Sequence, residues 1–415
     1  MKKTVILSIL FTSVLGLGSC QKENEEPSKT DPKPINLDLK SKSLLEADNA
    51  FAFDLFRDIL QNEEDEENIM VSPLSISLAL AMTYNGANGE TKEAMENVFH
   101  LHGLSVEDIN KSYQGLINAL LSVDPKVIME IANSIWYRDT FHIEDDFLSV
   151  NKTYYDAEVE GLDFTNPASK DIINQWVSSK THNKIEKIVD NIDPSDIMFL
   201  INAIYFKGTW KYQFENKNTL DSPFYTENGG YLKNVKMMNI KGDFGYFSND
   251  MFHAVELPYG QGNYSMVVLL PHSGVSIDDL VNEMSHEKWK TWMESFYERS
   301  DFDVYLPKFK FEYKKELKET LTNLGMGIAF SDFADFTKIN SNGGLFISSV
   351  KHKTFIEVNE EGTEAAAVTS VTISFTSAGP PSHFRADHPF VFVIKEKFTN
   401  AIMFMGKVGE PEAGS

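Results

Sequence analysis

The residue types that enzymes use for chemistry occur in this chain, but no spacing groups them into an active site. The 415 residues include 10 His, 61 Asp+Glu and one Cys. The patterns G-x-S-x-G, H-E-x-x-H, the P-loop and C-x-x-C do not occur in it. His286-Glu287 begins like a zinc-protease motif, but Lys290 stands where the second imidazole would be needed. We therefore expect no catalysis, no metal site and no cofactor.

Gly260 and Gly262 come close to a second chemical motif, the nucleotide fingerprint G-x-G-x-x-G, with Ser265 in place of the third glycine. That fingerprint works because a helix follows it and directs its N-terminus at a phosphate. Here β-rich runs stand on both sides and no helical pattern follows. The segment therefore predicts a hairpin turn.

The single cysteine, Cys20, is explained by the N-terminal sequence around it. Lys2 and Lys3 precede an apolar run over residues 5–17, which is too short to span a membrane comfortably as a permanent helix. The run ends in Leu17-Gly18-Ser19-Cys20, which resembles the lipobox of a bacterial lipoprotein signal. This resemblance implies a signal peptide over 1–19, cleavage before Cys20 and acylation of its thiol. The alternative is an ordinary secretory signal with an incidental Cys.

The residues after Cys20 indicate a flexible linker and the cellular location of the protein. Residues 21–27 are polar and acidic, and they resemble the export tag of surface lipoproteins in some Gram-negative bacteria. Residues 20–43 as a whole predict a flexible polar linker. We expect export across the inner membrane and anchoring in the outer membrane, at the cell surface, although the sequence leaves a periplasmic orientation open.

The negative net charge argues against nucleic acid as a binding partner. With 38 Lys+Arg against 61 Asp+Glu, the formal net charge is −23. Bulk electrostatics therefore oppose binding to nucleic acid. One Cys also excludes an internal disulfide framework.

Hydrophobic periodicity predicts helices first and then mainly strands, which is an α+β order and not an alternating βαβ order. Ser72 is an expected N-cap, with Pro73 at the first helical position. Helices are expected over residues 44–62, from 73, and over 105–122, 145–155, 169–181 and 314–324, the last closed by Gly325. Strands are expected over residues 199–206, 254–257, 264–270, 303–311, 355–358, 390–394 and 401–405.

The most informative segment runs from Glu360 to Pro381. Between Lys353 and Arg385 there is no Lys or Arg, and from residue 363 to 378 the single charge is that of Glu364. If the segment is extended, one face carries mostly apolar and small residues and the other is mostly polar. The apolar face comprises Thr363, Ala365, Ala367, Thr369, Val371, Ile373 and Phe375. Residues 377–381 read as a flexible connector, so the segment could exist in two states.

Several separate anchors, in order, resemble the serpin family over residues 46–411. They are Asn68-Ile69 with Ser72-Pro73-Leu74-Ser75-Ile76, Asn174-Gln175-Trp176-Val177 with Thr181 and Lys184-Ile185, the run from Leu200 to Trp210, Glu256-Leu257-Pro258-Tyr259, Asp387-His388-Pro389-Phe390, and Phe404 to Val408 with Pro411. The resemblance implies one serpin domain over 44–415. It also implies helices, a large central mixed sheet, two further sheets and an exposed reactive loop at about 360–381.

The function that this resemblance implies is suicide inhibition of serine-type endopeptidases. The loop is cleaved as bait, and the freed strand inserts into the central sheet together with the acyl-linked protease. Small residues at the hinge resemble those of inhibitory members, namely Gly362, Thr363, Glu364, Ala365, Ala366 and Ala367. The alternative is a non-inhibitory member that acts as a binding or structural surface protein. As a partner we expect a protease in a covalent complex; the chain itself would be a monomer at risk of loop–sheet polymerisation.

Counting residues along the loop does not give a single position for the bait bond. The hinge spacing places it at Thr376–Ser377, whereas counting back from residue 384 places it at Ala378–Gly379, and Phe375–Thr376 is a third candidate. Without Lys or Arg in the loop, a trypsin-like target is disfavoured. Elastase-, chymotrypsin- or subtilisin-like proteases fit better, and cysteine proteases stay open.

The resemblance also assigns control residues. Ser72, Ser75, Asn202 and His352 resemble the shutter beneath the opening sheet, and Trp210, Lys308 and Glu360 resemble the breach where insertion begins. Taken singly, each has a plainer reading as a helix cap, a core aromatic or a surface ion pair. The helix over 105–122 carries one Lys and no Arg, so no heparin-type activator site is expected there.

Overall fold

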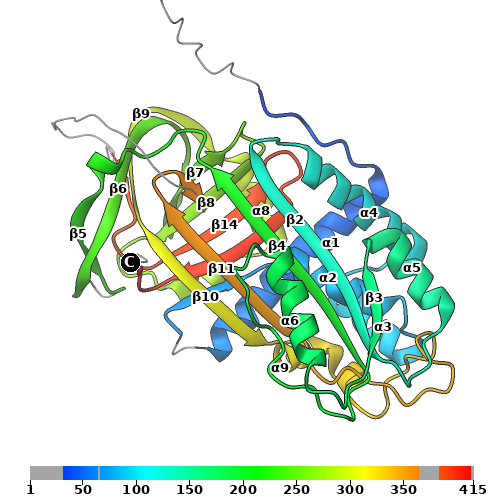
Figure 1. The fold of residues 1–415 in the computed structure, drawn as a ribbon. Helices are drawn as coiled ribbons and strands as arrows, with labels where there is room; N and C mark the ends of the chain where they lie inside the picture. Colours follow the sequence, from blue (N-terminus) through cyan, green and yellow to red (C-terminus); the bar gives the residue numbers. More distant parts are fainter. Residues whose placement is uncertain (1–30, 64–65, 228, 364–382, 413–415) are drawn as a thin grey trace, which may run out of the picture. The chain divides into compact units, whose positions relative to one another are not determined.

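Two β-sheets and a group of helices make up the body of the protein (Figure 1). The computed structural model describes residues 31–63, 66–227, 229–363 and 383–412. Residues 31–415 form one compact unit. The description that follows concerns that unit.

The helices come mostly from the first half of the chain, as the sequence predicts. Ser72 caps α2 with its side chain and Pro73 occupies the first helical position, while Ser105 and Asp108 form a reciprocal capping box at the start of α4. The helices are α1 (Leu39–Asn62), α2 (Pro73–Tyr84), α3 (Gly89–Val98), α4 (Val106–Ser122), α5 (Asp145–Tyr155), α6 (Ser169–Lys180), α7 (Ile277–Glu283), α8 (His286–Glu294) and α9 (Lys318–Leu321), with short turns η1 (Asn216–Asn218), η2 (Thr322–Met326) and η3 (Gly327–Phe330).

The six-stranded sheet has the order β10-β11-β12-β4-β2-β3. Its pairs are antiparallel except for β2 with β3, so the sheet is mixed. The strands are β2 (Val127–Arg138), β3 (Glu158–Leu162), β4 (Met198–Thr209), β10 (Phe309–Glu316), β11 (Lys351–Asn359) and β12 (Gly362–Thr363).

The nine-stranded sheet has the order β1-β15-β14-β8-β7-β6-β9-β13, with β5 on β6. The resemblance implies two further sheets; here the long strand β6 pairs with β5 and β9 along part of its length and with β7 along the rest, which joins them into one. The strands are β1 (Asn68–Val71), β5 (Leu220–Tyr225), β6 (Tyr231–Ser248), β7 (Phe252–Tyr259), β8 (Tyr264–Pro271), β9 (Tyr297–Pro307), β13 (His383–Arg385), β14 (Phe390–Glu396) and β15 (Ile402–Val408).

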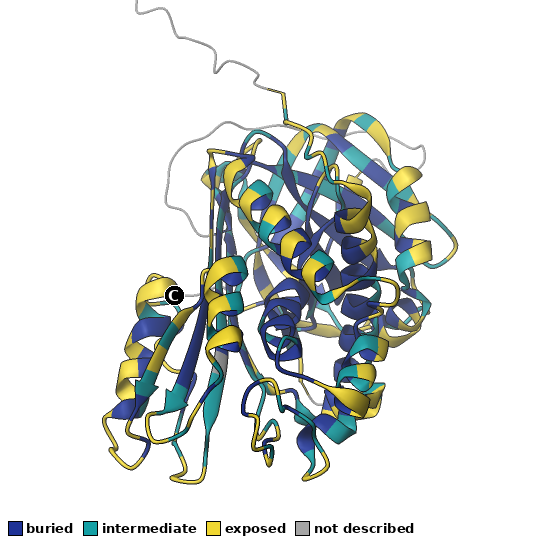
Figure 2. Cartoon of the chain, turned by 90° about the vertical axis from the view of Figure 1, so that its right-hand side faces the viewer, coloured by how far each residue is buried: buried dark blue, intermediate teal, exposed yellow. Residues whose placement is uncertain are grey.

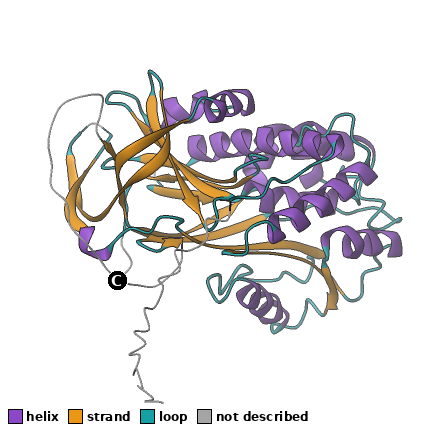
Figure 3. Ribbon diagram, turned by 90° about the horizontal axis from the view of Figure 1, so that it is seen from above, coloured by secondary structure: helices purple, strands orange, loops and turns teal. Residues whose placement is uncertain are grey.

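Most of the helices gather on one side of the sheets (Figure 3), and the helices turn exposed faces outward (Figure 2). The main core lies between the two sheets and the long helices. A second core lies on the other face of the six-stranded sheet, where Trp176 and Val177 of α6 pack with Trp136 and Ile201. The run at 198–206 is apolar at nearly every position because β4 is buried on both faces.

Three elements differ from the sequence predictions. Helix α1 begins at Leu39, so residues 39–43 belong to it and not to the linker; the Asp38 side chain caps it by accepting from the Ser41 amide at 2.8 Å. The strand expected over 303–311 is two strands in different sheets, which separate at Lys308.

The helix expected over 314–324 is the third difference. Strand β10 continues to Glu316, and α9 covers only four residues. Gly325 does close this region, with φ +116°. Periodicity over so short a span did not distinguish a strand end followed by a turn from a helix.

Candidate functional site: a gap in the six-stranded sheet

The six-stranded sheet is open between β11 and β4 beyond the end of β12. This two-residue strand pairs with β11 through Val358↔Thr363 and with β4 through Thr363↔Gly208. Beyond Thr363, no pairing joins β11 to β4 within the described part of the chain. Because β12 stands between them, the two strands are about two strand spacings apart, roughly 9–10 Å. We call this space the gap.

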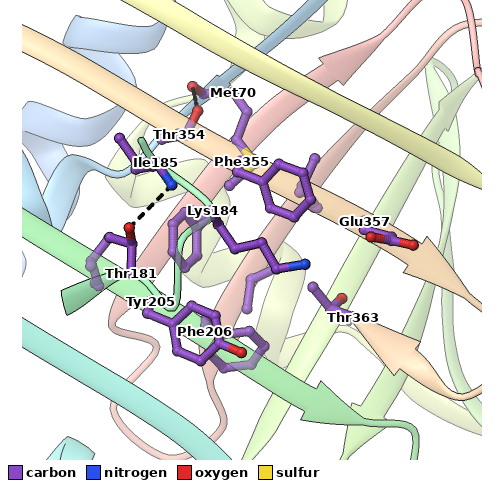
Figure 4. A pocket seen from close by; sticks show the side chains of 14 residues that line it. Met70, Thr181, Lys184, Ile185, Tyr205, Phe206, Thr354, Phe355, Glu357 and Thr363 are labelled. Carbon is purple, nitrogen blue, oxygen red and sulfur yellow. Dashed lines mark hydrogen bonds between the residues drawn. The ribbon is translucent and has the colours of Figure 1, made fainter. Parts of the chain in front are cut away.

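The walls and the floor of the gap belong to different parts of the molecule (Figure 4). Thr354 and Ile356 line it from β11, and Ile204 and Phe206 from β4. The floor comes from the nine-stranded sheet and includes Met70, Ile394 and Phe404. The volume inside is about 20 Å³, which is room for a water molecule and not for a strand. A strand can enter only if the surroundings move.

The covering segment is the connection that follows α6. Thr181, Lys184 and Ile185 line the gap from this connection. Its backbone is held in place by side chains. The amide of Ile185 donates to Thr181 Oγ1 at 3.1 Å. The amides of Ile188 and Val189 both donate to Asn174 Oδ1 on α6, each at 2.9 Å. The backbone of the cover is therefore held, and the cover would have to be displaced or passed if a strand entered the gap.

Thr363 is anchored at the entrance of the gap. It is 5% exposed, and its hydroxyl lies 2.7 Å from the Tyr259 hydroxyl. The Tyr259 ring stacks on Trp210 at 4.3 Å between centroids. The Trp210 indole donates from Nε1 to the carbonyl of Asn359 at 2.9 Å. These aromatic contacts fix the end of β11 and the first residues of β12 against β4.

Gly362 is required at this point by its backbone. Its φ is +153°, a conformation that L side chains rarely adopt. A β-carbon there would lie 2.0 Å from the Gly208 carbonyl oxygen and 2.7 Å from Thr209 Cα. Both are backbone atoms that cannot rotate away. Glycine therefore permits β12 to lie against β4.

Glu360 and Lys308 form the expected ion pair, but in a more buried setting than a surface pair. The distance between Lys308 Nζ and Glu360 Oε2 is 2.9 Å, and Thr219 Oγ1 donates to Glu360 Oε1 at 2.8 Å. Glu360 is 7% exposed and Lys308 30%. Burial opposes ionisation of Glu360, but the bonds from Lys308 and Thr219 outweigh it and keep its pKa below the usual range.

The predicted shutter residues lie together beneath the gap. The Ser72 amide donates to His352 Nε2 at 3.1 Å, and the Ser72 hydroxyl donates to the Met403 carbonyl at 2.8 Å. The Ser75 hydroxyl donates to Asn202 Oδ1. The start of α2 thus bridges β11 on one side of the gap and β4 on the other.

Burial lowers the pKa of His352 to about 4, so its ring is neutral at pH 7. Because Nε2 accepts from the Ser72 amide, the proton of the neutral ring lies on Nδ1. Protonation of Nε2 would remove this hydrogen bond and place a charge under the gap.

The same network extends further than the sequence predictions reached. Asn202 donates to Asn133 at 2.6 Å, Asn133 donates to the Tyr155 carbonyl at 2.6 Å, and the Tyr155 hydroxyl donates to Asn110 at 2.7 Å. Asn133, Tyr155 and Asn110 were not predicted, and neither was Tyr259. Buried Asn inside an apolar strand run, as at Asn133, is the signal that could have pointed to them.

The remaining predicted site residues lie outside the described residues. They are Cys20, Glu364, Ala365, Ala366, Ala367, Phe375, Thr376, Ser377, Ala378 and Gly379. In the described ranges, no helix combines the length and apolar character needed to cross a bilayer.

Chemically, the gap offers main-chain hydrogen bonds and not reactive groups. Thr363 is already paired on both sides, so a chain that continues from it in an extended conformation would find donors and acceptors on β11 and β4. If the surroundings moved to make room, a further strand that begins at Thr363 could pair antiparallel with both neighbours.

Comparison with known proteins agrees with this geometry. Residues 46–411 match the family model described as Serpin (serine protease inhibitor). A serpin-like protein of Methanosarcina mazei is 35% identical over 98% of this chain and 96% of its own length. The leukocyte elastase inhibitor of Sus scrofa is 36% identical over 88% of this chain and 98% of its own length.

A crystal structure of the thermophilic serpin tengpin in the native state superposes with a TM-score of 0.80. It has 35% sequence identity and covers 92% of this chain and 98% of its own. The family model spans the gap, the hinge and the network beneath them in a single match. The chain therefore belongs to the serpin family.

Proposed function

We propose that this chain inhibits serine-type endopeptidases as a suicide substrate, by cleavage of the segment after Thr363 and insertion of the freed strand into the gap. The observation that carries the proposal is the pairing of Thr363 with both β11 and β4, together with the lack of any pairing between these two strands beyond it in the described ranges. An inserted strand would fill the site without a change in the order of the other strands.

The balance of energies supports insertion. If the register of β12 continues, the odd-numbered residues after Thr363 face the main core, as Thr363 does. That face would bury Val371, Ile373 and Phe375, each worth about 1.5–3 kcal/mol. The small residues at 365–367 would pass beneath the cover with little steric resistance.

The covalent step uses the protease's own groups. Its serine oxygen bonds to the carbonyl carbon of the residue before the scissile bond, the peptide bond breaks, and the departing amine takes the proton from the protease's general base. The inhibitor contributes no catalyst. Its role is to insert before water hydrolyses the acyl bond.

For the scissile bond we propose Thr376–Ser377, from the hinge count. Strand β4 begins at Met198, which the continued antiparallel register places beside residue 373. All three candidate bonds lie beyond this point, so each would leave a strand long enough to line the whole wall. The length of the wall therefore does not distinguish the three bonds, and Thr376–Ser377 is preferred on the hinge count alone.

For the targets we propose elastase-, chymotrypsin- or subtilisin-like proteases, with cysteine proteases as a further possibility for the assay. The loop has no Lys or Arg to enter a cation-seeking pocket. The porcine relative is named as an inhibitor of leukocyte elastase, which supports testing that class first.

We also propose that the chain is a lipoprotein anchored through Cys20 at the outer membrane, on the cell-surface side. The signal pattern at 1–20 and the acidic residues after it support this. The test compares the wild type with Cys20→Ser for partition into detergent-rich phase and for release from membranes. Surface protease accessibility in intact cells distinguishes the two orientations. Equal partition of both variants would refute the lipid anchor.

The inhibitory mechanism is tested by incubating the protein with chymotrypsin, elastase and subtilisin in parallel. We expect a complex that survives boiling in denaturant. The first residue of the released C-terminal peptide should be Ser377. Cleavage by all three enzymes with no stable complex would instead favour a non-inhibitory binding or structural role.

A further inference from the structure

Four of the ten His residues lie together at one end of the nine-stranded sheet. His253 is on β7, His272 follows β8, His383 is on β13 and His388 lies between β13 and β14. Each of the other three is close enough to His253 to act on its charge. The proposed function uses none of these rings. Because imidazoles take up protons in mildly acidic solution, the charge at this end of the sheet depends on pH.

His253 packs against β13. Its ring centroid is 5.0 Å from that of Phe384, the buried side chain of β13, and 5.3 Å from that of His272. The ring of Tyr246 on β6 lies at 6.4 Å. Within the described part of the chain, the His253 ring makes no hydrogen bond. It therefore supports Phe384 as a neutral ring, and a second proton on it would have no protein acceptor there.

Strand β13 has few other attachments. It is three residues long and, in the described ranges, pairs with a single strand, β9. After it, the Ala386 amide donates to the Tyr305 carbonyl at 3.0 Å, and the Arg385 guanidinium donates to the Ser222 hydroxyl. Because Phe384 is fully buried, its packing on β7 contributes much of what keeps β13 on the sheet.

Asp387 is the carboxylate that favours a proton on His253, but it is already shared. Its Oδ1 lies 3.0 Å from His388 Nδ1, and its Oδ2 lies 3.4 Å from Arg385 Nε. Burial opposes a proton on His388, but its bonds to Asp387 and to the Pro271 carbonyl, at 2.9 Å, outweigh burial and raise its pKa. His388 is therefore charged before His253 as pH falls. The other titratable or charged groups around these rings are Tyr246, Tyr305, Asp303 and Glu227.

We propose that protonation of His253 in mildly acidic solution releases β13 from β9. A proton on this ring adds a cation beside His272 and His388, while Asp387 is already engaged. The charged ring gains hydration by moving into water, and Phe384 then loses the surface on which it packs. Because β13 directly follows the candidate bait segment in the sequence, its release would end the hold of β9 on that side of the segment. Release is measured at β13 itself, so it does not depend on the proposed inhibition.

The direction of the pH effect follows from the two states of the ring. With β13 in place, burial and the neighbouring imidazoles lower the pKa of His253 to about 4, whereas a ring in water has the ordinary value of 6.5. The released state therefore binds more protons between these values, and release becomes more favourable as pH falls from 6.5 toward 4. The equilibrium constant for release should rise about 30-fold between pH 8 and pH 5.

Hydrogen exchange of the Ala386 amide tests the proposal. Its rate is divided by that of an unstructured peptide of the same sequence at the same pH, which removes the pH dependence of exchange itself. In the wild type we expect protection at Ala386 to fall about 30-fold between pH 8 and pH 5. His253→Gln and His253→Phe both remove the titration, one with a polar and one with an apolar side chain. Both variants should lose less than about threefold of their protection.

Two controls accompany these variants. His142→Gln removes an imidazole that is 67% exposed and lies 3.8 Å from Glu144, and it should behave like the wild type. The Trp210 amide, which donates to the Glu361 carbonyl at 2.7 Å beside the gap, reports openings elsewhere in the body. Its protection should fall less than that of Ala386.

Three results would overturn the proposal. The first is constant protection at Ala386 between pH 8 and pH 5 in the wild type. The second is a full fall that persists in either His253 variant, which would assign release to another group. The third is a parallel fall at Trp210, which would show unfolding of the whole body and not release of one strand.

Discussion

Two buried carboxyl groups in this molecule have opposite environments. Glu360 is stabilised as an anion by Lys308 and Thr219, as described above. Asp48, on α1, is 6% exposed and accepts from the Tyr113 hydroxyl at 2.7 Å. Its other oxygen has no hydrogen-bond partner among the described residues. Burial therefore raises the pKa of Asp48 to about 7, against the hydrogen bond from Tyr113.

Asp48→Asn should remove a pH-dependent loss of stability. The folded pKa of about 7 exceeds the ordinary value of 3.8, so the folded state holds more protons between these values and stability falls as pH rises through that window. At pH 8 the variant should gain on the order of a few kcal/mol in unfolding free energy, and near pH 4 it should match the wild type. Urea unfolding across this range measures the difference.

Other buried groups also change the stability of the fold over this pH range. His352 and His253 have pKa values lowered to about 4 by burial, so they contribute stability that is lost as pH falls from 6.5 toward 4. Only the difference between variant and wild type therefore reports Asp48. Asp54→Asn is the control, since hydrogen bonding to His100 lowers the pKa of that carboxyl. A constant offset between Asp48→Asn and wild type at every pH would contradict the assignment.

Lys308→Gln should destabilise the fold by about 1–3 kcal/mol, because it leaves a nearly buried carboxylate without its cation. The control is Lys310→Gln, which breaks the more exposed pair with Glu357 and should cost less than about 1 kcal/mol. Denaturant midpoints of the two variants provide the measurement. Equal losses would show that burial of Glu360 does not matter.

At the scale of elements, β12 is the decisive strand although it is two residues long. It pairs with β11 on one side and with β4 on the other, and so holds the two strands apart at the entrance of the gap. A strand this short cannot be found by periodicity. Its existence depends on Gly362, on the Tyr259 hydroxyl and on the aromatic stack behind it.

Gly362→Ala should therefore separate β12 from β4. The new β-carbon would collide with backbone at 2.0 Å, and the amide of Trp210, which donates to the Glu361 carbonyl at 2.7 Å, should lose protection. Hydrogen exchange at Trp210 measures this. Gly344→Ala controls for backbone strain alone, because its φ is +75° but no atom lies within 4 Å of the added carbon. Similar exchange at Trp210 in both variants would exclude the clash as the cause.

At the scale of the whole molecule, the proposed inhibition would depend on which of two events comes first, insertion of the strand or hydrolysis of the acyl bond. Thr363→Arg should shift the outcome toward hydrolysis by tenfold or more, since a charge would have to be buried at a position that is 5% exposed. Gel separation of covalent complex from cleaved chain measures the partition. Thr363→Ser, which keeps the hydroxyl near Tyr259, should behave like the wild type; an undiminished complex yield for the Arg variant would refute the argument.

Much of the fold could be predicted from local patterns. The cap at Ser72 and the helix at 145–155 were confirmed because the signals that set them lie within a few residues. The division of 303–311 into two strands was missed. Which sheet a strand joins depends on partners far away in the sequence, and alternation looks the same in either.

The sequence by itself determined the composition of the hinge, the uncharged loop and the motifs by which the family is recognised. The tertiary structure decided what these residues meet. His352 lies 280 positions from Ser72, and Lys184 lies over Phe355, because hydrogen bonding and burial bring distant segments to one gap. The sequence shows which side chains are present. Only the packing of the chain determines which of them are buried together, and so which contacts contribute to the free energy of folding.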